Sequence, residues 1–280
     1  MKVEIDKNIE ILYGLSYCIN REKNDLKDYN TKENNKYIDD FYNIYLNNID
    51  DSVKNKILSI GDYHRLAKYY FNNGDMSFID CSIFDSYFEN SKLYYDMVIK
   101  DICSNKYLDK VDFDSLKKFY NLDLGNVNIY VSLFISGGFG IYTDRSIIIL
   151  GFKYNKEKDK YGVNGTLVCK LYHEFSHPYV SRIIENKGIE LINSNNEVSD
   201  YYKDNYIEEL LVRTMETIFS SKIFGNEYIS WAIENEEKNG FELVKDFVSV
   251  YLKNEKYIKN INDYIIVLLE NILINELNVL

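Results

Sequence analysis

The sequence predicts an α+β fold that is mostly helical, with one small mixed sheet. Three observations support this class. Apolar residues recur at helical spacing through much of residues 8–121. Residues 127–135 then alternate, with an aliphatic side chain at every second position, and residues 146–152 form a short apolar run, as strands do. Helical spacing returns from residue 166, so we expect the sheet to lie next to the helix that begins there.

The N-terminal part contains five predicted helices. The first, residues 8–22, has Ile9, Leu12 and Leu15 among its apolar residues, and a polar, charged loop is expected at 24–35. The other helices are predicted over about residues 36–50, 52–74, 79–105 and 113–121.

The chain shows no internal repeat and no long linker, so residues 1–280 are predicted to form a single domain. Within it we expect three subregions: an N-terminal helical part (1–125), a core with the strands and two functional helices (126–225), and C-terminal helices (226–280).

Gly137-Gly138-Phe139-Gly140 stands between the two predicted strands and predicts a hairpin turn. The segment does not match G-x-G-x-x-G or a P-loop, so phosphate binding is not expected. The strand at 146–152 directly precedes the next helix, where an edge strand could hold an extended peptide by strand addition.

The next helix is predicted over residues 166–187. Thr166 is a suitable N-cap after the breaker Asn164-Gly165, and Lys187-Gly188 is typical of a C-terminus. Pro178, the only proline, predicts a kink or an end, because it cannot donate to the carbonyl of residue 174. Residues at helical spacing form its apolar face: Leu167, Val168, Leu171, Tyr172, Phe175, Val180, Ile183 and Ile184.

This helix carries an H-E-x-x-H motif, His173 to His177, which uses two of the three histidines in the chain. Residues four apart lie on one helix face, about 6 Å apart along the axis, so both imidazoles can reach one Zn²⁺ ion. Glu174 lies about 100° around the helix, where a carboxylate can take a proton from a metal-bound water. The alternative is a buried amphipathic helix whose histidines are satisfied by neighbouring groups.

A catalytic zinc needs a third protein ligand and leaves a fourth position for water. The metzincin pattern would place a glycine and a histidine where this chain has Val180 and Ile183, which excludes that class. The remaining histidine, His64, lies far upstream and is expected to be a surface or capping residue. The third ligand should therefore be a carboxylate.

A helix predicted over about residues 202–224 is the best source of this carboxylate. Glu209 flanks its apolar side, and Arg213 at i+4 could orient the carboxylate, so Glu209 is favoured over Glu208 and then Glu216. The alternative is a solvated acidic face. Cys169, four residues before the first motif histidine, is expected to be a small buried residue, with a fourth metal ligand as the alternative.

Composition limits the classes of binding partner and the cellular compartments that we expect for this protein. A net charge of −11 argues against binding to nucleic acid or to an anionic membrane surface, because both require a basic patch. The four cysteines are widely spaced, with no C-x-x-C, and we expect neither a signal peptide nor a transmembrane helix, because the N-terminus has no apolar core and no 18-residue apolar stretch occurs. A cytoplasmic location is the resulting expectation.

These motifs resemble the zincin superfamily of metallopeptidases, in its gluzincin branch, and more narrowly an uncharacterised bacterial family whose domain has no assigned function. The resemblance implies a zincin-like fold, zinc held by His173, His177 and Glu209, and Glu174 as the catalytic carboxylate. The matching segments are Asn8-Ile-Glu-Ile-Leu-Tyr-Gly-Leu15, Ser-Gly-Gly-Phe-Gly140, His-Glu-Phe-Ser-His-Pro178 and Glu-Leu-Leu-Val-Arg213.

One position departs from the gluzincin pattern. Many gluzincins carry an Asp one turn after the glutamate ligand, which supports the first histidine, whereas this chain has Arg213. The partner of His173 must then come from elsewhere, such as a backbone carbonyl or Glu216.

The function predicted from these residues is zinc-dependent hydrolysis of a peptide or protein substrate, with Glu174 as general base. A tyrosine at 201, 202 or 206 is the candidate donor to the oxyanion. The alternative is a non-catalytic, zinc-stabilised binding protein on the same scaffold. An open fourth coordination position would favour the enzyme, and a fourth protein ligand would favour the binding protein.

Overall fold

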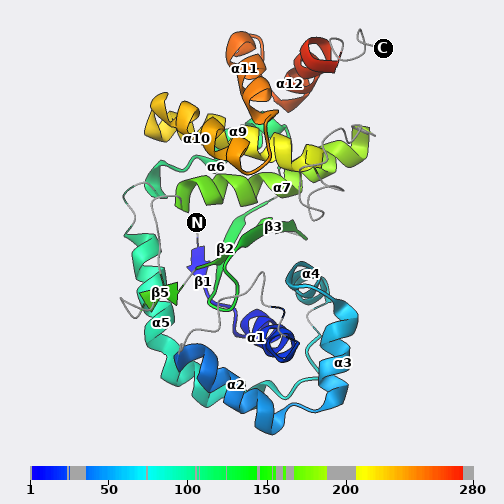
Figure 1. Cartoon of the computed structure of the whole chain (residues 1–280), viewed down its shortest axis with the longest axis vertical. Helices are drawn as coiled ribbons and strands as arrows, with labels where there is room; N and C mark the ends of the chain where they lie inside the picture. Colours follow the sequence, from blue (N-terminus) through cyan, green and yellow to red (C-terminus); the bar gives the residue numbers. More distant parts are fainter. Residues whose placement is uncertain are drawn as a thin grey trace. The chain divides into compact units, whose positions relative to one another are not determined.

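The chain folds mostly into helices, with one mixed sheet of four strands, which confirms the predicted α+β class (Figure 1). It forms two compact units: residues 1–105 with 126–165, and residues 106–125 with 166–280. The single-domain expectation stays a prediction. This computed structural model describes residues 2–23, 25, 36–73, 75–104, 106, 108–123, 125–143, 146–152, 154–155, 160–161, 167–187 and 206–273.

The first unit is built around helix α1 (Lys7–Glu22), which contacts three other helices of the unit. The carboxylate of Asp6 caps α1 by accepting the N–H groups of Asn8 and Ile9. The remaining helices of the unit are α2 (Lys36–Asn48), α3 (Asp51–Ile60), α4 (Tyr63–Asn73) and α5 (Asp85–Cys103), with a 3₁₀ turn η1 (Cys81–Phe84) before α5.

The single helix predicted over residues 52–74 is two helices, so that prediction is wrong in one detail. Gly61 ends α3 with φ at +115°, a backbone conformation that other residues rarely adopt. The Asp62 carboxylate then accepts the N–H of Arg65, which starts the next helix. A glycine followed by a capping residue therefore outweighed the helical spacing around it.

The four-stranded sheet belongs to the first unit and has the order β1-β2-β4-β3. The pairs β1–β2 and β2–β4 are parallel, with Ile129 opposite Ile148, and the pair β3–β4 is antiparallel. Every residue of β4 is buried. The strands are β1 (Lys2–Glu4), β2 (Val127–Ser132), β3 (Gly138–Tyr142) and β4 (Ser146–Gly151), and a separate pair is formed by β5 (Tyr154–Asn155) and β6 (Lys160–Tyr161).

The hairpin predicted at the glycine-rich segment is wrong. Residues 138–140 belong to strand β3, and the strands on either side of the segment are parallel neighbours. The close backbone approach is at Gly151 of β4, whose N–H donates to the Gly137 carbonyl at 2.6 Å. A Cβ at Gly151 would lie 2.2 Å from the Ile135 carbonyl oxygen.

A buried carboxylate joins α1 to three other parts of the first unit. Glu10 has no solvent exposure, and its Oε1 accepts from the Tyr37 hydroxyl at 2.9 Å, the Tyr95 hydroxyl at 3.2 Å and the Leu133 N–H at 2.8 Å. Burial raises the pKa of Glu10 to about 7, although hydrogen bonds from Ser132, Leu133 and Tyr95 lower it. The carboxyl group is therefore poised to change charge near neutral pH.

The second unit consists of helices only, as far as its residues are described. Helix α9 (Tyr206–Phe224) lies at its centre and contacts α7 (Leu167–Lys187), α10 (Glu227–Lys238) and α11 (Val244–Asn254). The other elements are η2 (Leu108–Lys110), α6 (Phe113–Tyr120), α12 (Ile261–Leu268) and η3 (Leu269–Leu273). The predicted helices of the C-terminal region are thus present, and α10, α11 and α12 follow α9.

Aromatic side chains fix the rotation of α7. Phe175 packs on Phe113 with ring centroids 4.6 Å apart, and Tyr179 stacks on Tyr120 at 4.9 Å. These rings anchor one face of α7 on α6, and the histidine face is left toward α9.

Helix α7 continues through Pro178 to Lys187, so it does not end at the proline. The two residues that follow the proline, Tyr179 and Val180, are buried, and this packing keeps the second half of the helix in place. The predicted cap at Thr166, the glycine at 188 and the loop that precedes residue 202 lie outside the described residues.

Candidate metal centre

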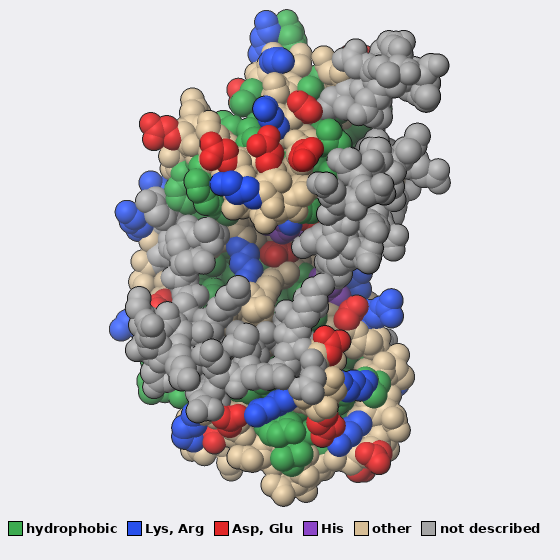
Figure 2. All heavy atoms as spheres, viewed as in Figure 1, with side chains coloured by type: hydrophobic (Ala, Val, Ile, Leu, Met, Phe, Trp, Pro, Cys, Tyr) green, Lys and Arg blue, Asp and Glu red, His purple; other side chains and the backbone are tan. Residues whose placement is uncertain are grey.

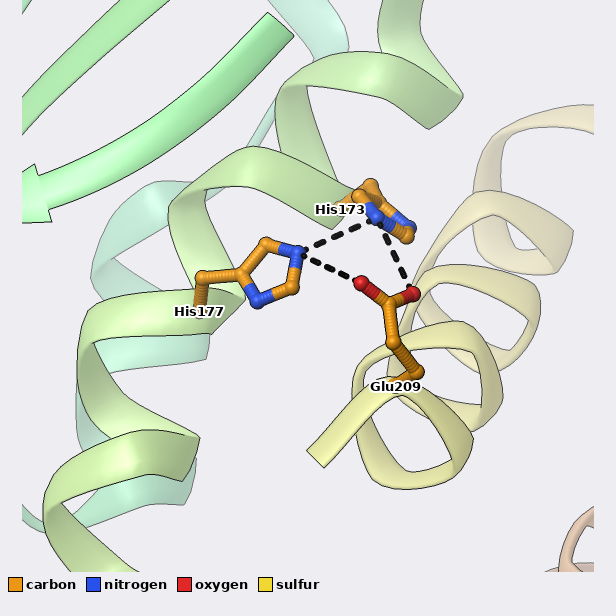
Figure 3. A group of neighbouring side chains, drawn as sticks. All are labelled: His173, His177 and Glu209. Atoms are coloured by element: carbon orange, nitrogen blue, oxygen red, sulfur yellow. Dashed lines mark hydrogen bonds and ion pairs between the residues drawn. The ribbon is translucent and has the colours of Figure 1, made fainter. Parts of the chain in front are cut away.

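Helices α7 and α9 bring the three predicted ligands together (Figure 3). The Nε2 atoms of His173 and His177 are 3.2 Å apart. The Glu209 carboxylate reaches both, with Oε1 3.5 Å from Nε2 of His177 and Oε2 3.7 Å from Nε2 of His173. One donor atom from each residue lies within 4.8 Å of the others.

Each histidine also contacts a glutamate on its other nitrogen. Nδ1 of His173 is 3.0 Å from Glu216 Oε2, and Nδ1 of His177 is 2.8 Å from Glu208 Oε1. An ionised carboxylate can only accept hydrogen bonds, so both Nδ1 atoms carry the proton and, in a neutral ring, both Nε2 atoms carry a lone pair. Glu208, the alternative ligand considered from sequence, therefore orients a histidine.

The geometry and the charges fit a divalent cation. Two Nε2 lone pairs that face each other at 3.2 Å, beside a carboxylate, repel one another unless a proton or a metal ion lies between them, and a metal ion can interact with all three groups at once. A tetrahedral zinc ion with bonds of about 2.0–2.1 Å places its donor atoms roughly 3.3 Å apart, close to the separations found here. The donor set of two imidazoles and one carboxylate is also one that zinc accepts.

The raised pKa of His173 also indicates that the site favours positive charge. Burial lowers this pKa, but the hydrogen bond to Glu216 and the charges of Glu209 and Glu174 raise it to about 9. The surrounding carboxylates thus favour a cation at this position.

Glu209, the candidate third ligand, is held by Arg213, as its i, i+4 spacing predicted. Nε of Arg213 donates to Glu209 Oε2 at 3.1 Å, and its Nη1 donates to Glu236 Oε2 on α10. Burial raises the pKa of Glu209, but the charges of His173, His177 and Arg213 hold it below its ordinary value. Glu209 is therefore ionised and available as a ligand at neutral pH.

Glu174 differs from the other glutamates of the site. It is 6% exposed, and in the part of the chain that the structure describes its carboxylate makes no hydrogen bond or ion pair. Burial raises its pKa, against the opposing charges of His173 and His177. A buried, unpaired carboxylate with a raised pKa is suited to accept and return a proton.

Cys169 is buried, and its Sγ lies 3.0 Å from the Tyr228 hydroxyl. Burial raises the pKa of the thiol. Among the described residues, neither Cys169 nor His64 joins the cluster of potential ligands. His64 instead packs against the ring of Phe139, with centroids 4.3 Å apart, within the first unit.

The proposed oxyanion donor has no support from a contact. Tyr201 and Tyr202 lie outside the described residues, and the ring of Tyr206 stacks on Phe241 with centroids 5.6 Å apart. The Tyr206 hydroxyl is buried without a hydrogen-bond partner among the described residues, so its role stays a prediction.

Sequence reasoning missed Glu236. It lies on α10, where Glu227, Glu234 and Glu237 are equally plausible from sequence, and it is the one of the four that is buried. The one sequence feature that distinguishes Glu236 is that it lies four residues after Ala232, on the same face of the helix, and Ala232 is buried.

The charged side chains on the surface are of mixed sign. Figure 2 shows basic and acidic side chains interspersed among the described residues of the face drawn, without a continuous basic patch. In the described part of the chain, no helix combines the length and the apolar character needed to cross a bilayer.

Comparisons with protein-family models, curated proteins and solved structures found no match. The resemblance to zincins therefore stays a prediction that depends on the motif, and the function must be argued from the site itself.

Proposed function

We propose that this protein is a zinc-dependent hydrolase, and that it acts as a metallopeptidase. In this proposal His173, His177 and Glu209 hold the metal and Glu174 is the general base. The observation that carries it is the convergence of three donor atoms within 4.8 Å, each on a side chain held by a further residue.

The number of ligands favours an enzyme over a zinc-stabilised binding protein. The cluster contains three protein ligands among the described residues, and a structural zinc site would use four. The unpaired carboxylate of Glu174 gives further support, because a purely structural site has no use for a buried base beside its ligands.

The chain's own residues supply orientation and proton transfer. Glu208 and Glu216 fix the tautomer and orientation of the two rings, so that both Nε2 atoms point at one place. A zinc ion bound there would polarise a carbonyl group and lower the pKa of a coordinated water toward about 7.

Glu174 would take a proton from the water that attacks the amide carbon. It would return this proton to the amine as the C–N bond breaks, which leaves Glu174 ionised for the next cycle. Its raised pKa supports this double role, since a carboxylate of very low pKa would be a poor proton acceptor.

The test compares the unmodified protein with Glu174→Gln, using zinc-loaded protein and a mixed fluorogenic peptide library. We expect the unmodified protein to cleave peptides, and the variant to bind zinc equally while cleaving about 10²- to 10⁴-fold more slowly. Glu227→Gln, at an exposed position of α10, is the control and should keep full activity.

Two outcomes would contradict the proposal. Equal cleavage by Glu174→Gln would remove this residue from the mechanism. Zinc binding without cleavage, together with a fourth protein ligand on the metal, would favour the binding protein instead.

A further inference from the structure

Arg213 lies between two carboxylates that come from different helices. Its Nε donates to Glu209 of α9, and its Nη1 donates to Glu236 of α10. Its guanidinium group also lies over the ring of Phe241, 4.0 Å from the centroid. These contacts connect a residue on α10 to a candidate metal ligand on α9.

We propose that Glu236 is a positioning residue for the metal ligand Glu209, acts through Arg213, and thereby sets the affinity of the site for zinc. The inference rests on the metal site of the proposed function. It adds that α10, which supplies no ligand itself, takes part in metal binding.

The direction of the hydrogen bonds carries the first step. A guanidinium group can pair with one carboxylate through two parallel N–H donors, which would occupy both carboxylate oxygens. Here two donors of Arg213 go to different carboxylates: Nη1 donates to Oε2 of Glu236, and Nε donates to Oε2 of Glu209. Oε1 of Glu209 faces Nε2 of His177, at 3.5 Å.

Burial carries the second step. Glu236 is 7% exposed and Glu209 is 8% exposed, so neither carboxylate has bulk water as an alternative partner. A buried charge that loses its partner rearranges toward another one. Without the Glu236 carboxylate, the guanidinium group of Arg213 loses its anchor on α10 and would shift toward Glu209, where it would compete with the metal for the carboxylate.

The aromatic contact limits how far Arg213 can move in response. The guanidinium group lies over the ring of Phe241, and this ring also stacks on Tyr206. The planar group therefore turns within its plane more easily than it leaves the site, which favours the two-oxygen pairing with Glu209 over a swing into solvent.

The experiment measures the dissociation constant for Zn²⁺ by competition with a chromogenic chelator. We expect Glu236→Gln to bind zinc about 10- to 100-fold more weakly than the unmodified protein. Glu234→Gln is the matched control, since Glu234 is exposed on the same helix, and its dissociation constant should stay unchanged.

A double-mutant cycle tests whether the effect passes through Arg213. Arg213→Gln should weaken zinc binding, and adding Glu236→Gln to it should cause no further loss. Fully additive losses would show that Glu236 acts independently and would overturn the inference.

A loss of folding is separated from a loss of positioning by two further measurements. The melting temperature of each metal-free variant reports folding, and the visible spectrum of the Co²⁺-loaded protein reports ligand geometry. A purely structural role would lower the melting temperature and leave the Zn²⁺ dissociation constant and the Co²⁺ spectrum unchanged. If Glu236→Gln does not fold, Glu236→Asp keeps the charge with a shorter reach and should weaken zinc binding several-fold.

The failures of the two proposals can be told apart. If the unmodified protein binds zinc and Glu236→Gln binds it equally well, the inference is wrong while the metal site stands. If the unmodified protein binds no zinc, both are wrong.

Discussion

The Nε2 atoms of His173 and His177 lie 3.2 Å apart, on rings whose Nδ1 atoms contact two different glutamates of one helix. Both glutamates come from α9, which also supplies Glu209. One turn of α7 and three turns of α9 thus contain the candidate ligands and the groups that orient the histidines. The candidate ligands and the partners of the histidines thus lie on one pair of helices within one unit.

Glu208 and Glu209 are neighbours in sequence and should behave differently. Glu209→Gln should abolish zinc binding, because a neutral amide replaces the anionic ligand. Glu208→Gln should weaken binding about 10- to 100-fold, because it removes only the acceptor for Nδ1 of His177. Titration calorimetry with zinc measures the affinity of both variants. A larger loss of zinc affinity in Glu208→Gln than in Glu209→Gln would make Glu208 the ligand and would contradict this assignment.

Glu216 should support His173 in the same way. Its carboxylate is 3.0 Å from Nδ1 of His173, and the Tyr228 hydroxyl lies 3.5 Å from its other oxygen. We expect Glu216→Gln to weaken zinc binding by about one to two orders of magnitude. Tyr228→Phe should have a smaller effect, because its contact is long. Equal zinc affinity in Glu216→Gln and the unmodified protein would contradict this role.

Pro178→Ala should stabilise the protein. A proline inside a helix costs up to about 3 kcal/mol, because it removes one backbone hydrogen bond and its ring crowds the preceding turn. Urea unfolding should therefore give a higher free energy of unfolding for the variant, and Ser181→Ala on the same helix should change it by much less. A lower value for Pro178→Ala would show that the proline is accommodated without cost.

Glu10 should make stability depend on pH in the first unit. Its pKa is about 7 in the folded protein and close to 4.5, its ordinary value, when unfolded. The folded state therefore holds a proton that the unfolded state releases, and the stabilising contribution is complete below pH 4.5 and lost as the pH rises to about 7. By linkage the loss amounts to about 3 kcal/mol.

Glu10→Gln keeps the carboxyl group's shape without its charge and serves to measure this loss. Relative to the unmodified protein, the variant should gain about 3 kcal/mol of unfolding free energy between pH 4.5 and pH 7.5. Other carboxylates titrate equally in both proteins and cancel in the difference. A difference between the two proteins that does not change over this pH range would show that folding does not raise the pKa of Glu10.

The features of the site that could be predicted from the sequence are those that lie within a single helix. The i, i+4 spacing of the two histidines needs only a helix to bring them to one face, and α7 supplies it. Arg213 distinguished Glu209 from Glu208 for the same reason, because i, i+4 pairs on a helix can be read without knowing the fold.

The sequence was uninformative where contacts join separate elements. The partner of His177 depends on the rotation of α9 against α7, and the burial of Glu236 depends on how α10 packs on α9. Neither arrangement leaves a periodic signal, so both contacts became visible only with the structure, whereas Glu216 was already one of the partners considered for His173.

The sheet shows the same limit. Alternation identified β2, and the apolar run identified β4, but the parallel pairing of these strands depends on contacts distant in sequence. The start of strand β3 was interpreted as a turn because glycines are common in turns, whereas Gly138 and Gly140 pair with β4 as strand residues.

The most direct test of the metal site is anomalous scattering at the zinc absorption edge from crystals grown with zinc. We expect one peak per chain, between the Nε2 atoms of His173 and His177 and the carboxylate of Glu209, with no fourth protein ligand. The absence of a peak at this position, with zinc present in the crystal, would contradict the assignment of these residues as ligands and the hydrolase proposed from them.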